Sequence, residues 1–519
     1  MSFTSSKAML QDTRFRIQEA DYESAIALKT VADLFQALNN TDIRYCHWKS
    51  NLRLERGLYG QTDMDLLVDP QHRQIFKQLL EKYRIKPILA PPGKRYPSIE
   101  DYLGFDPLTG RLFHLHVHYQ LVLGEQFVKN YHLPLENEFL DSVQIHSGVK
   151  IPSPELELIV LSIRALLKYR DRDVIKDIFS IRSSGMPSHI LEEFNWLLGQ
   201  TSIEKVSDVL TNISNVIPPD LILNLLTTIL VSPRAGYKLF HLRKQARRVV
   251  RRYQRHERLQ ATITYFVEVW RRRKSFLRFK PERKMTLPTG GVTLALVGAD
   301  GAGKTTLSRE LVKWLSWKLD VHPYYLGSKQ PSWMSKFSYL LFRIARRGQR
   351  TLSRIVGENA FITRFIEALR QILLYSHYLF IGHDRYGRYL AGRRNASEGS
   401  IVIFDRYPLE APLDGPQIHA FREDSTDLIV RTFSKLERNL YSKVQMPDLF
   451  CVLEVSPEIS IRRKPDHQWM AIETKNLLLR KLTDSMKAND KEVRIAHINA
   501  GLPLEQVLLQ IKRAIWGAL

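Results

Sequence analysis

Hydrophobic and polar residues follow two different periods in the first 150 residues of this chain of 519. Apolar residues at helical spacing predict a helix over residues 25–38, and short apolar runs or strict alternation predict strands. The expected strands cover residues 43–46, 64–68, 102–105 and 112–121, with a turn at residues 107–110 joining the last two into a hairpin. This mixture indicates an α+β domain over residues 1–150.

Helical periodicity dominates residues 151–285. Ser153 is a typical N-cap, Pro154 suits the first helical position and Glu155 suits the first turn, ahead of an apolar-periodic run over residues 156–167. Further helical patterns continue to about residue 231. We therefore expect a helical region here.

A basic segment occupies residues 238–284, which hold seventeen Lys or Arg and three Glu, a net charge of +14. Because its arginines recur every three to four residues, a helix here would carry one broad cationic face. The arginines in question are Arg243, Arg247, Arg251, Arg255 and Arg258. Proline and glycine at residues 281–291 then indicate a linker, and strands and helices alternate over residues 291–519.

Composition narrows the choice of environment. With 44% hydrophobic and 25% charged residues the chain is typical of a globular protein, but its net charge of +23 predicts attraction to polyanions. Cys46 and Cys451 both lie in strand-like runs, which argues against a disulfide framework and favours a reducing, cytoplasmic location. The amino terminus lacks the apolar run of a signal peptide, and we expect no transmembrane segment.

A phosphate-binding loop is predicted at residues 298–305, which read Gly-Ala-Asp-Gly-Ala-Gly-Lys-Thr between a short apolar strand and a helix. This is the GxxxxGK[ST] pattern in the context that it requires. Glycines let the backbone wrap around phosphates, Lys304 reaches the β and γ oxygens, and the Thr305 hydroxyl joins Mg²⁺. ATP and Mg²⁺ are the expected cofactors, held by Gly298, Asp300, Gly301, Ala302, Gly303, Lys304, Thr305 and Thr306.

Charged residues follow two later strands of this region. A buried-strand pattern over residues 400–404 ends in Asp405 and Arg406, where an acid would hold Mg²⁺ and an arginine would grip an acceptor phosphate. A strand at residues 449–455 leads into a helix with Arg462 and Arg463. These cations fit either a solvated face or a mobile lid that neutralises the transferring phosphoryl group.

Together these motifs resemble the thymidylate-kinase-like branch of nucleoside-monophosphate kinases. The matching segments are GADGAGKTT at residues 298–306, GHDR at 382–385, IVIFDRY at 401–407, PDLFCVLEVSP at 447–457 and INAG at 498–501. The resemblance implies a P-loop kinase fold over residues 291–519, a parallel sheet with helices on both faces. It implies catalytic roles for Lys304, Asp405, Arg462 and Arg463, acceptor contacts from Arg385, Asp405 and Arg406, and Mg²⁺ ligands at Thr305 and Asp405.

Two departures leave the acceptor open between a nucleoside monophosphate and another small phosphorylated compound. Thymidylate kinases show an acidic-Pro-Gly-Gly signature after the second strand, where this chain has Tyr-Leu-Gly-Ser-Lys at residues 325–329. A basic insertion follows, with Arg343, Arg346, Arg347, Arg350 and Arg354.

Asp63 and Asp65 are separated by one residue on a predicted strand and therefore point to the same face. Such a pair suits Mg²⁺ binding in nucleotidyl transfer. The segments TDMDLLV at residues 62–68 and LHVH at 115–118, with the helices after Pro154, resemble the nucleotidyltransferase superfamily. The resemblance implies metal ligation by Asp63 and Asp65. Where the family places a third carboxylate this chain has His116, so retention and loss of activity both stay open.

His114, His116 and His118 alternate on one predicted strand. They are compatible with a Zn²⁺ site, but no cysteine lies near them in the sequence, and we favour a structural or substrate-contacting role.

Two functional hypotheses follow. The first is a phosphotransferase fused to a nucleotidyltransferase-like domain. The second is an ATP-binding regulatory protein that binds nucleic acid or an anionic membrane through residues 238–284, a segment that could equally be a solvated basic face. Whether the protein forms an oligomer stays open.

Overall fold

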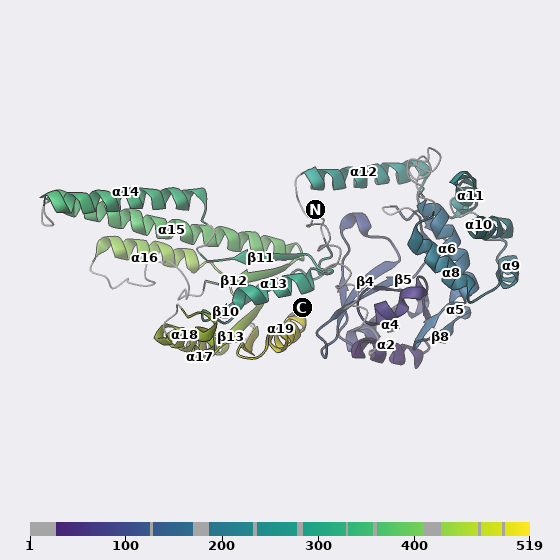
Figure 1. Ribbon diagram of the computed structural model, residues 1–519, viewed down its shortest axis with the longest axis horizontal. Coiled ribbons are helices and arrows are strands. Elements are labelled where there is room, and N and C mark those ends of the chain that lie inside the picture. The colour runs from purple at the N-terminus through teal and green to yellow at the C-terminus, as the bar shows by residue number, and fades with distance from the viewer. Residues whose placement is uncertain are drawn as a thin grey trace, which may run out of the picture. The chain divides into compact units, whose positions relative to one another are not determined.

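The chain forms two compact units, Met1–Arg283 (unit 1) and Lys284–Leu519 (unit 2) (Figure 1). The computed structural model describes residues 27–124, 128–169, 186–231, 236–277, 284–327, 331–356, 361–408, 427–465, 469–489 and 494–519.

Unit 1 contains a five-stranded mixed sheet with the strand order β1-β2-β5-β4-β3. The strands are β1 (Tyr45–His47), β2 (Asp63–Val68), β3 (Lys86–Ile88), β4 (Ile99–Phe105) and β5 (Leu112–His118). β2 and β5 pair in parallel, and the other neighbours pair antiparallel. The predicted hairpin is confirmed, although its first strand begins three residues earlier than expected.

Two helices, α2 (Lys29–Asn39) and α4 (Arg73–Lys82), pack on one face of this sheet. Leu34 and Phe76 from these helices meet Met64 and Leu66 of β2 in one buried cluster. The predicted helix over residues 25–38 corresponds to α2, and residues 25 and 26 lie outside the described part. The smaller elements are η1 (Asn51–Arg53), α3 (Leu54–Leu58), η2 (Pro70–His72), η3 (Pro92–Lys94), β6 (Val122–Leu123), β7 (Tyr131–His132), α5 (Glu136–Asp141), β8 (Gln144–His146) and β9 (Val149–Ile151).

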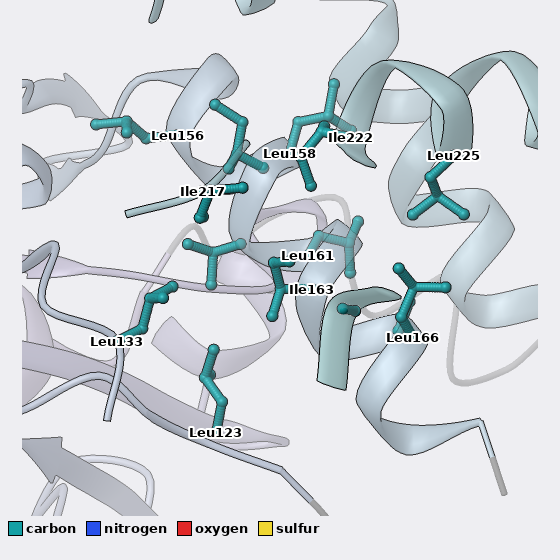
Figure 2. Close-up of a cluster of buried hydrophobic side chains, with 14 of the residues drawn as sticks. Leu123, Leu133, Leu156, Leu158, Leu161, Ile163, Leu166, Ile217, Ile222 and Leu225 are labelled. Carbon is teal, nitrogen blue, oxygen red and sulfur yellow. The ribbon is translucent and has the colours of Figure 1, made fainter. Parts of the chain in front are cut away.

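Helices from residue 154 onward build a second core in unit 1. They are α6 (Pro154–Lys168), α8 (Ser188–Leu198), α9 (Ile203–Asn212), α10 (Pro219–Val231), α11 (Gly236–Val249) and η4 (Val250–Tyr253). α12 (Arg258–Leu277) follows them, and none of its described residues belongs to this core. The predicted N-cap is confirmed, since Ser153 Oγ accepts a hydrogen bond from Leu156 N at 3.4 Å. Figure 2 shows Leu161 and Leu166 of α6 among Leu225 of α10 and Leu123 and Leu133 beside the sheet. Cys46 of β1 and Leu67 of β2 belong to the same cluster, so this second core joins the helices to the sheet.

The basic segment does not form the single cationic helix that we expected. α11 ends at Val249, a 3₁₀ turn follows, and α12 begins only at Arg258. The Arg243 side chain is 2% exposed, and the main-chain N–H of Arg255 donates to Asn130 O at 2.8 Å. The reason is an apolar stripe along α11, which the charges alone do not reveal. Residues recur there at helical spacing and lie in the hydrophobic core, namely Leu239, Leu242, Ala246 and Val250.

Unit 2 contains a parallel sheet with the strand order β11-β12-β10-β13-β14. The strands are β10 (Thr293–Gly298), β11 (Val321–Tyr325), β12 (Ile401–Asp405), β13 (Leu449–Glu454) and β14 (Arg494–Asn499). The prediction of a parallel sheet is confirmed, and β10, the first strand of this unit, lies at its centre.

Helices cover both faces of this sheet. The described helices of this unit are α13 (Lys304–Leu315), α14 (Trp333–Val356), α15 (Phe361–Ser397), α16 (Leu428–Tyr441), α17 (Pro457–Arg463), α18 (Trp469–Asn489) and α19 (Leu504–Ala518), of which α14 and α16 pack on α15. Val297 and Phe404 point toward Tyr389 of α15 and Leu479 of α18, whereas α13 and α19 pack on the other side. The arginine-rich insertion forms α14. None of the helices in the described ranges combines the length and apolarity that crossing a membrane requires.

The stretch that we interpreted as a linker belongs largely to unit 2. Leu287 N donates to Gly399 O at 2.9 Å, and Gly291 N donates to Ala396 O at 2.7 Å. A Cβ on Gly291 would lie 1.9 Å from Ser400 O, so glycine is needed here for close approach of two backbone segments. Residues 281–283 lie outside the described part.

Candidate functional site

The phosphate-binding loop joins β10 to α13 in unit 2. Gly301 and Gly303 both have φ +87°, in the left-handed region that favours glycine. A Cβ on Gly301 would lie 2.5 Å from Ser460 Oγ, and one on Gly298 would lie 2.7 Å from Leu453 O. Since Gly303 is the N-cap of α13, the loop leads directly to the amino end of that helix, where N–H groups and the helix dipole favour an anion.

Lys304 and Thr305 begin α13. The Lys304 side chain is held inside the loop, since its ammonium donates to Gly298 O at 2.6 Å and to Ala299 O at 3.0 Å. Thr305 Oγ1 donates to Asp405 Oδ2 at 3.3 Å. Asp405 ends β12, the strand beside β10, and is 5% exposed. The predicted pair of a hydroxyl and a carboxylate therefore meets, and both are hard oxygen ligands that fit Mg²⁺.

Asp300 in the loop gathers two cations. Its carboxylate lies 2.7 Å from Lys475 Nζ and 3.7 Å from Arg406 Nη2. Burial alone would raise the pKa of Asp300, but the hydrogen bond from Lys475 and the charges of Lys475, Lys304 and Arg406 outweigh it and lower the pKa to about 2. Asp300 is therefore ionised at neutral pH and holds both cations at the loop.

Arg406 adopts a left-handed backbone with φ 63°, a conformation that costs an ordinary residue about 1–2 kcal/mol. Its guanidinium lies 5.7 Å from the ring centroid of Tyr325 at the end of β11. The strained turn after β12 thus directs Arg406 toward the loop and toward the second strand of the sheet.

The two predicted lid arginines differ in placement. Arg463 Nη1 donates to Ala500 O at 3.0 Å and to Gly301 O at 3.4 Å, so it lies against the phosphate-binding loop. Arg462 is exposed on α17. Thr306 is exposed on α13, and Ala302 is buried beneath the loop.

The GHDR segment lies within α15. Arg385 is 1% exposed, and its Nη1 donates to Tyr441 Oη at 2.8 Å. Asp384 accepts hydrogen bonds from Ser332 N at 2.8 Å and from Ser335 Oγ at 2.7 Å. Three residues on, Arg388 donates to Gly327 O at 3.1 Å. This segment therefore anchors the region that departs from the thymidylate kinase pattern.

A second polar cluster lies on one face of the unit 1 sheet. Asp65 of β2, His116 of β5 and Asp101 of β4 are directly paired across three neighbouring strands. His116 Nδ1 lies 2.7 Å from Asp101 Oδ1, and His114 Nε2 lies 3.1 Å from the same oxygen. Sequence reasoning missed Asp101, because the predicted strand began one residue after it.

The two predicted carboxylates of this cluster already have partners. Asp65 Oδ1 lies 2.7 Å from Lys49 Nζ, and Asp63 Oδ1 lies 3.0 Å from His114 Nδ1. Burial opposes ionisation of Asp65, but the positive charge of Lys49 and the interactions with His116 and His118 together outweigh it and hold the pKa of Asp65 well below its usual range. Burial lowers the pKa of His116 and His118, which favours neutral imidazoles.

A cavity of about 290 Å³ adjoins these carboxylates. Asp63 and Asp65 form part of its wall, together with four basic side chains from two segments of unit 1. The basic residues are Lys49, Arg53, Arg164 and Lys168. Ser50, with φ 59°, also lines it and donates its N–H to Glu193 Oε1 at 3.1 Å. A cavity with these walls suits an anionic ligand beside the carboxylates.

Comparison with known proteins gives relatives of only part of the chain. No protein-family model matches it. The Escherichia coli K12 proteins YghR and YghS, each described as an uncharacterised ATP-binding protein, are 27% and 26% identical to it over 229 and 235 residues. These alignments cover 43% and 44% of this chain and 86% and 93% of the relatives. Among solved structures, deoxyadenosine kinase from M. mycoides with bound dATP shows 17% identity and a TM-score of 0.25, covering 43% of this chain and 98% of that one.

Proposed function

We propose that unit 2 binds ATP with Mg²⁺ and transfers its γ-phosphoryl group to a small phosphorylated acceptor. The observation that carries this proposal is the gathering of Lys304, Thr305 and Asp405 at one loop, with the cations Arg406 and Lys475 beside Asp300. The relatives that are described as ATP-binding proteins support the donor. The thymidylate-kinase-like motifs support the class of reaction.

In the reaction an acceptor oxygen attacks the γ phosphorus, the bond to the β–γ bridging oxygen breaks, and ADP leaves with that electron pair. Mg²⁺, held by Thr305 and Asp405, would supply charge neutralisation of the phosphates. Lys304 and the amino end of α13 bind the β and γ oxygens. Arg463 lies against the loop and neutralises the charge that spreads over the transferring group.

The positive charge beside the phosphate-binding loop indicates that the acceptor carries a phosphate group. Arg406 lies at the carboxyl end of β12, and its guanidinium can grip an acceptor phosphate in a bidentate manner. Asp300 holds Arg406 and Lys475 side by side. Their positive charges reduce the repulsion between the phosphates of ATP and the phosphate of an approaching acceptor. Because residues 325–329 replace the acidic-Pro-Gly-Gly signature, the acceptor class is a nucleoside monophosphate or a sugar phosphate, without restriction to thymidylate.

The test offers γ-labelled ATP and Mg²⁺ to the full chain with a panel of nucleoside monophosphates and sugar phosphates. We expect label on at least one acceptor, and a loss of about 100-fold or more in Lys304→Met. Lys313→Met, an exposed lysine on the same helix, is the matched control and should keep wild-type activity. If wild-type protein binds ATP but labels no acceptor in the panel, the phosphotransferase proposal is overturned.

That same outcome would favour the alternative, an ATP-binding regulatory protein that docks on nucleic acid or an anionic membrane through residues 238–284. Exposed cations on α11 and in the following turn support this reading, among them Lys238, Lys244, Arg248, Arg251 and Arg252. It predicts binding of an oligonucleotide or of anionic liposomes that falls steeply with salt concentration. A gel shift with the oligonucleotide and co-sedimentation with the liposomes show which of the two partners the protein binds.

A further inference from the structure

Three side chains of unit 1 converge in an arrangement typical of a metal site. Asp65, His116 and His118 each offer one ligand atom, and these atoms lie within 4.8 Å of one another. Asp65 comes from β2, and the two histidines come from the neighbouring strand β5. All three lie on the same face of the sheet, because side chains two residues apart on a strand point the same way.

His118 is the side chain that most needs a ligand. It is completely buried, and neither of its ring nitrogens has a hydrogen-bond partner among the residues that the structure describes. Its Nε2 lies 3.7 Å from Asp65 Oδ1, too far for a hydrogen bond. Two ligands of one transition metal ion lie about 3–3.5 Å apart. The gap between these two atoms is therefore within a few tenths of an ångström of the separation that a shared ion would impose.

Asp101 prepares His116 for the same role. Its carboxylate lies 2.7 Å from His116 Nδ1, which fixes the proton on that nitrogen and leaves Nε2 with its lone pair. Metal-binding histidines commonly donate their second ring nitrogen to a carboxylate in this way, which orients the ring and raises its basicity. The side chain that sequence reasoning missed thus acts on a ligand and does not itself need to touch the ion.

Mg²⁺ does not fit this cluster, although the nucleotidyltransferase resemblance implies it at Asp63 and Asp65. Mg²⁺ prefers an octahedron of oxygen ligands, and here two of the three converging groups are imidazoles. Asp63 is drawn to His114, 3.0 Å away. We propose that Asp65, His116 and His118 form a binding site for a transition metal ion of the Zn²⁺, Mn²⁺ or Fe²⁺ class, with Asp101 as its positioning residue.

Lys49 sets the affinity of the site. Its ammonium lies 2.7 Å from Asp65 Oδ1, the oxygen that also faces His118. An ion that binds Asp65 must therefore displace or share this ammonium, and two cations beside one carboxylate repel each other. Removing the charge of Lys49 removes the competitor, so the affinity for the metal rises.

The ion has a route and room for a further ligand. Asp65 and Lys49 both line the 290 Å³ cavity, so the carboxylate can be reached from it. Three protein ligands leave at least one coordination position for water or for an anion in the cavity. The basic side chains of the same wall favour such an anion.

The test uses the untagged full chain, freed of metal and then titrated with Co²⁺ and Zn²⁺ in millimolar Mg²⁺, which fills oxygen-rich sites. We expect one equivalent to bind, with visible Co²⁺ absorption that Zn²⁺ abolishes. Asp65→Asn and His116→Asn should each weaken binding by more than tenfold, and Asp101→Asn by about 10- to 100-fold. His132→Asn, a change at a histidine of the same unit outside the cluster, is the matched control and should bind like wild type.

The variant Lys49→Met distinguishes loss of a metal ligand from general destabilisation of the fold. A destabilising substitution lowers metal affinity, whereas the proposal predicts a several-fold increase for this variant, with the melting temperature recorded for each protein. Failure of the wild type to bind Co²⁺ or Zn²⁺ would overturn the proposal. So would one-equivalent binding that stays unchanged in both Asp65→Asn and His116→Asn, or weaker binding in a folded Lys49→Met protein.

Discussion

Glu157 makes the stability of unit 1 depend on pH. It lies on α6, is 2% exposed and accepts two hydrogen bonds from Asn51, from the main-chain N at 3.1 Å and from Nδ2 at 2.7 Å. Burial raises the pKa of Glu157 more than these hydrogen bonds lower it, to about 7, and the charge of Glu193 adds to the increase. The folded protein therefore holds a proton on Glu157 in a pH range where the unfolded chain does not.

The sign and size follow from this difference. A carboxyl whose pKa rises from 4.5 to about 7 on folding contributes stability fully below pH 4.5 and loses it as pH rises to about 7. Each pKa unit corresponds to about 1.4 kcal/mol, so the loss is about 3 kcal/mol by pH 8. Glu157→Gln removes this titration. It also places the glutamine NH₂ group opposite a donor of Asn51, so one hydrogen bond is lost at a cost of about 1–3 kcal/mol. The variant should be less stable than wild type at pH 4.5 and should gain about 3 kcal/mol relative to it by pH 8.

The measurement is urea unfolding at pH 4.5 to 8, followed by hydrogen exchange of peptides from α6 so that unit 1 is observed by itself. Wild type and variant are compared at equal pH, which cancels titration elsewhere in the chain. Glu138→Gln, at an exposed position of α5, is the control and should follow wild type throughout. A difference between Glu157→Gln and wild type that stays constant over the whole pH range would refute the reasoning.

Three further substitutions test the core and the phosphate-binding loop. Leu166→Ala, in the core that Figure 2 shows, should cost 2–5 kcal/mol in urea unfolding, whereas Leu230→Ala, at a 54% exposed position, should cost less than about 0.5 kcal/mol. Gly301→Ala forces a Cβ to within 2.5 Å of Ser460 Oγ at φ +87° and should weaken ATP binding at least tenfold by calorimetry, whereas Gly348→Ala, with open space around it, should leave it unchanged. Lys475→Met should lower kcat about 10- to 100-fold with a smaller change in the KM for ATP, in steady-state assays.

Local chemistry made the phosphate-binding loop predictable. Gly301, Gly303 and Lys304 follow one another in sequence, and each is fixed by its own backbone conformation or by contacts within six residues, so the pattern carries the geometry. Asp405 could also be placed, because a residue that ends a parallel strand must lie at the same sheet edge as the loop. These are short-range consequences of chain direction.

The missed residues depend on long-range packing. Lys475 reaches Asp300 across 175 positions in the sequence, and nothing in the pattern of α18 marks that lysine among its neighbours. Asp101 joins the histidines only through the register of β4 against β5, and a register error of one residue moves a side chain to the other face. The prediction for the basic segment was wrong for a related reason. The spacing of charged residues predicts an exposed face only when no apolar residues recur at helical spacing in the same helix.

The two carboxylate clusters show why a carboxylate alone does not identify a metal. Asp405 lies beside the Thr305 hydroxyl, so the donors around it are hard oxygens and suit an ion that keeps much of its hydration. Asp65 lies beside two imidazoles, which favour ions that bind nitrogen. It also lies beside the Lys49 ammonium, which a weakly bound ion would not displace. Affinity for divalent ions at such nitrogen-containing sites rises from Mn²⁺ to Cu²⁺ and is lower again for Zn²⁺, whereas Mg²⁺ gains little from imidazole. Under the two proposals one chain would hold two different metals, because the side chains next to each carboxylate select the ion.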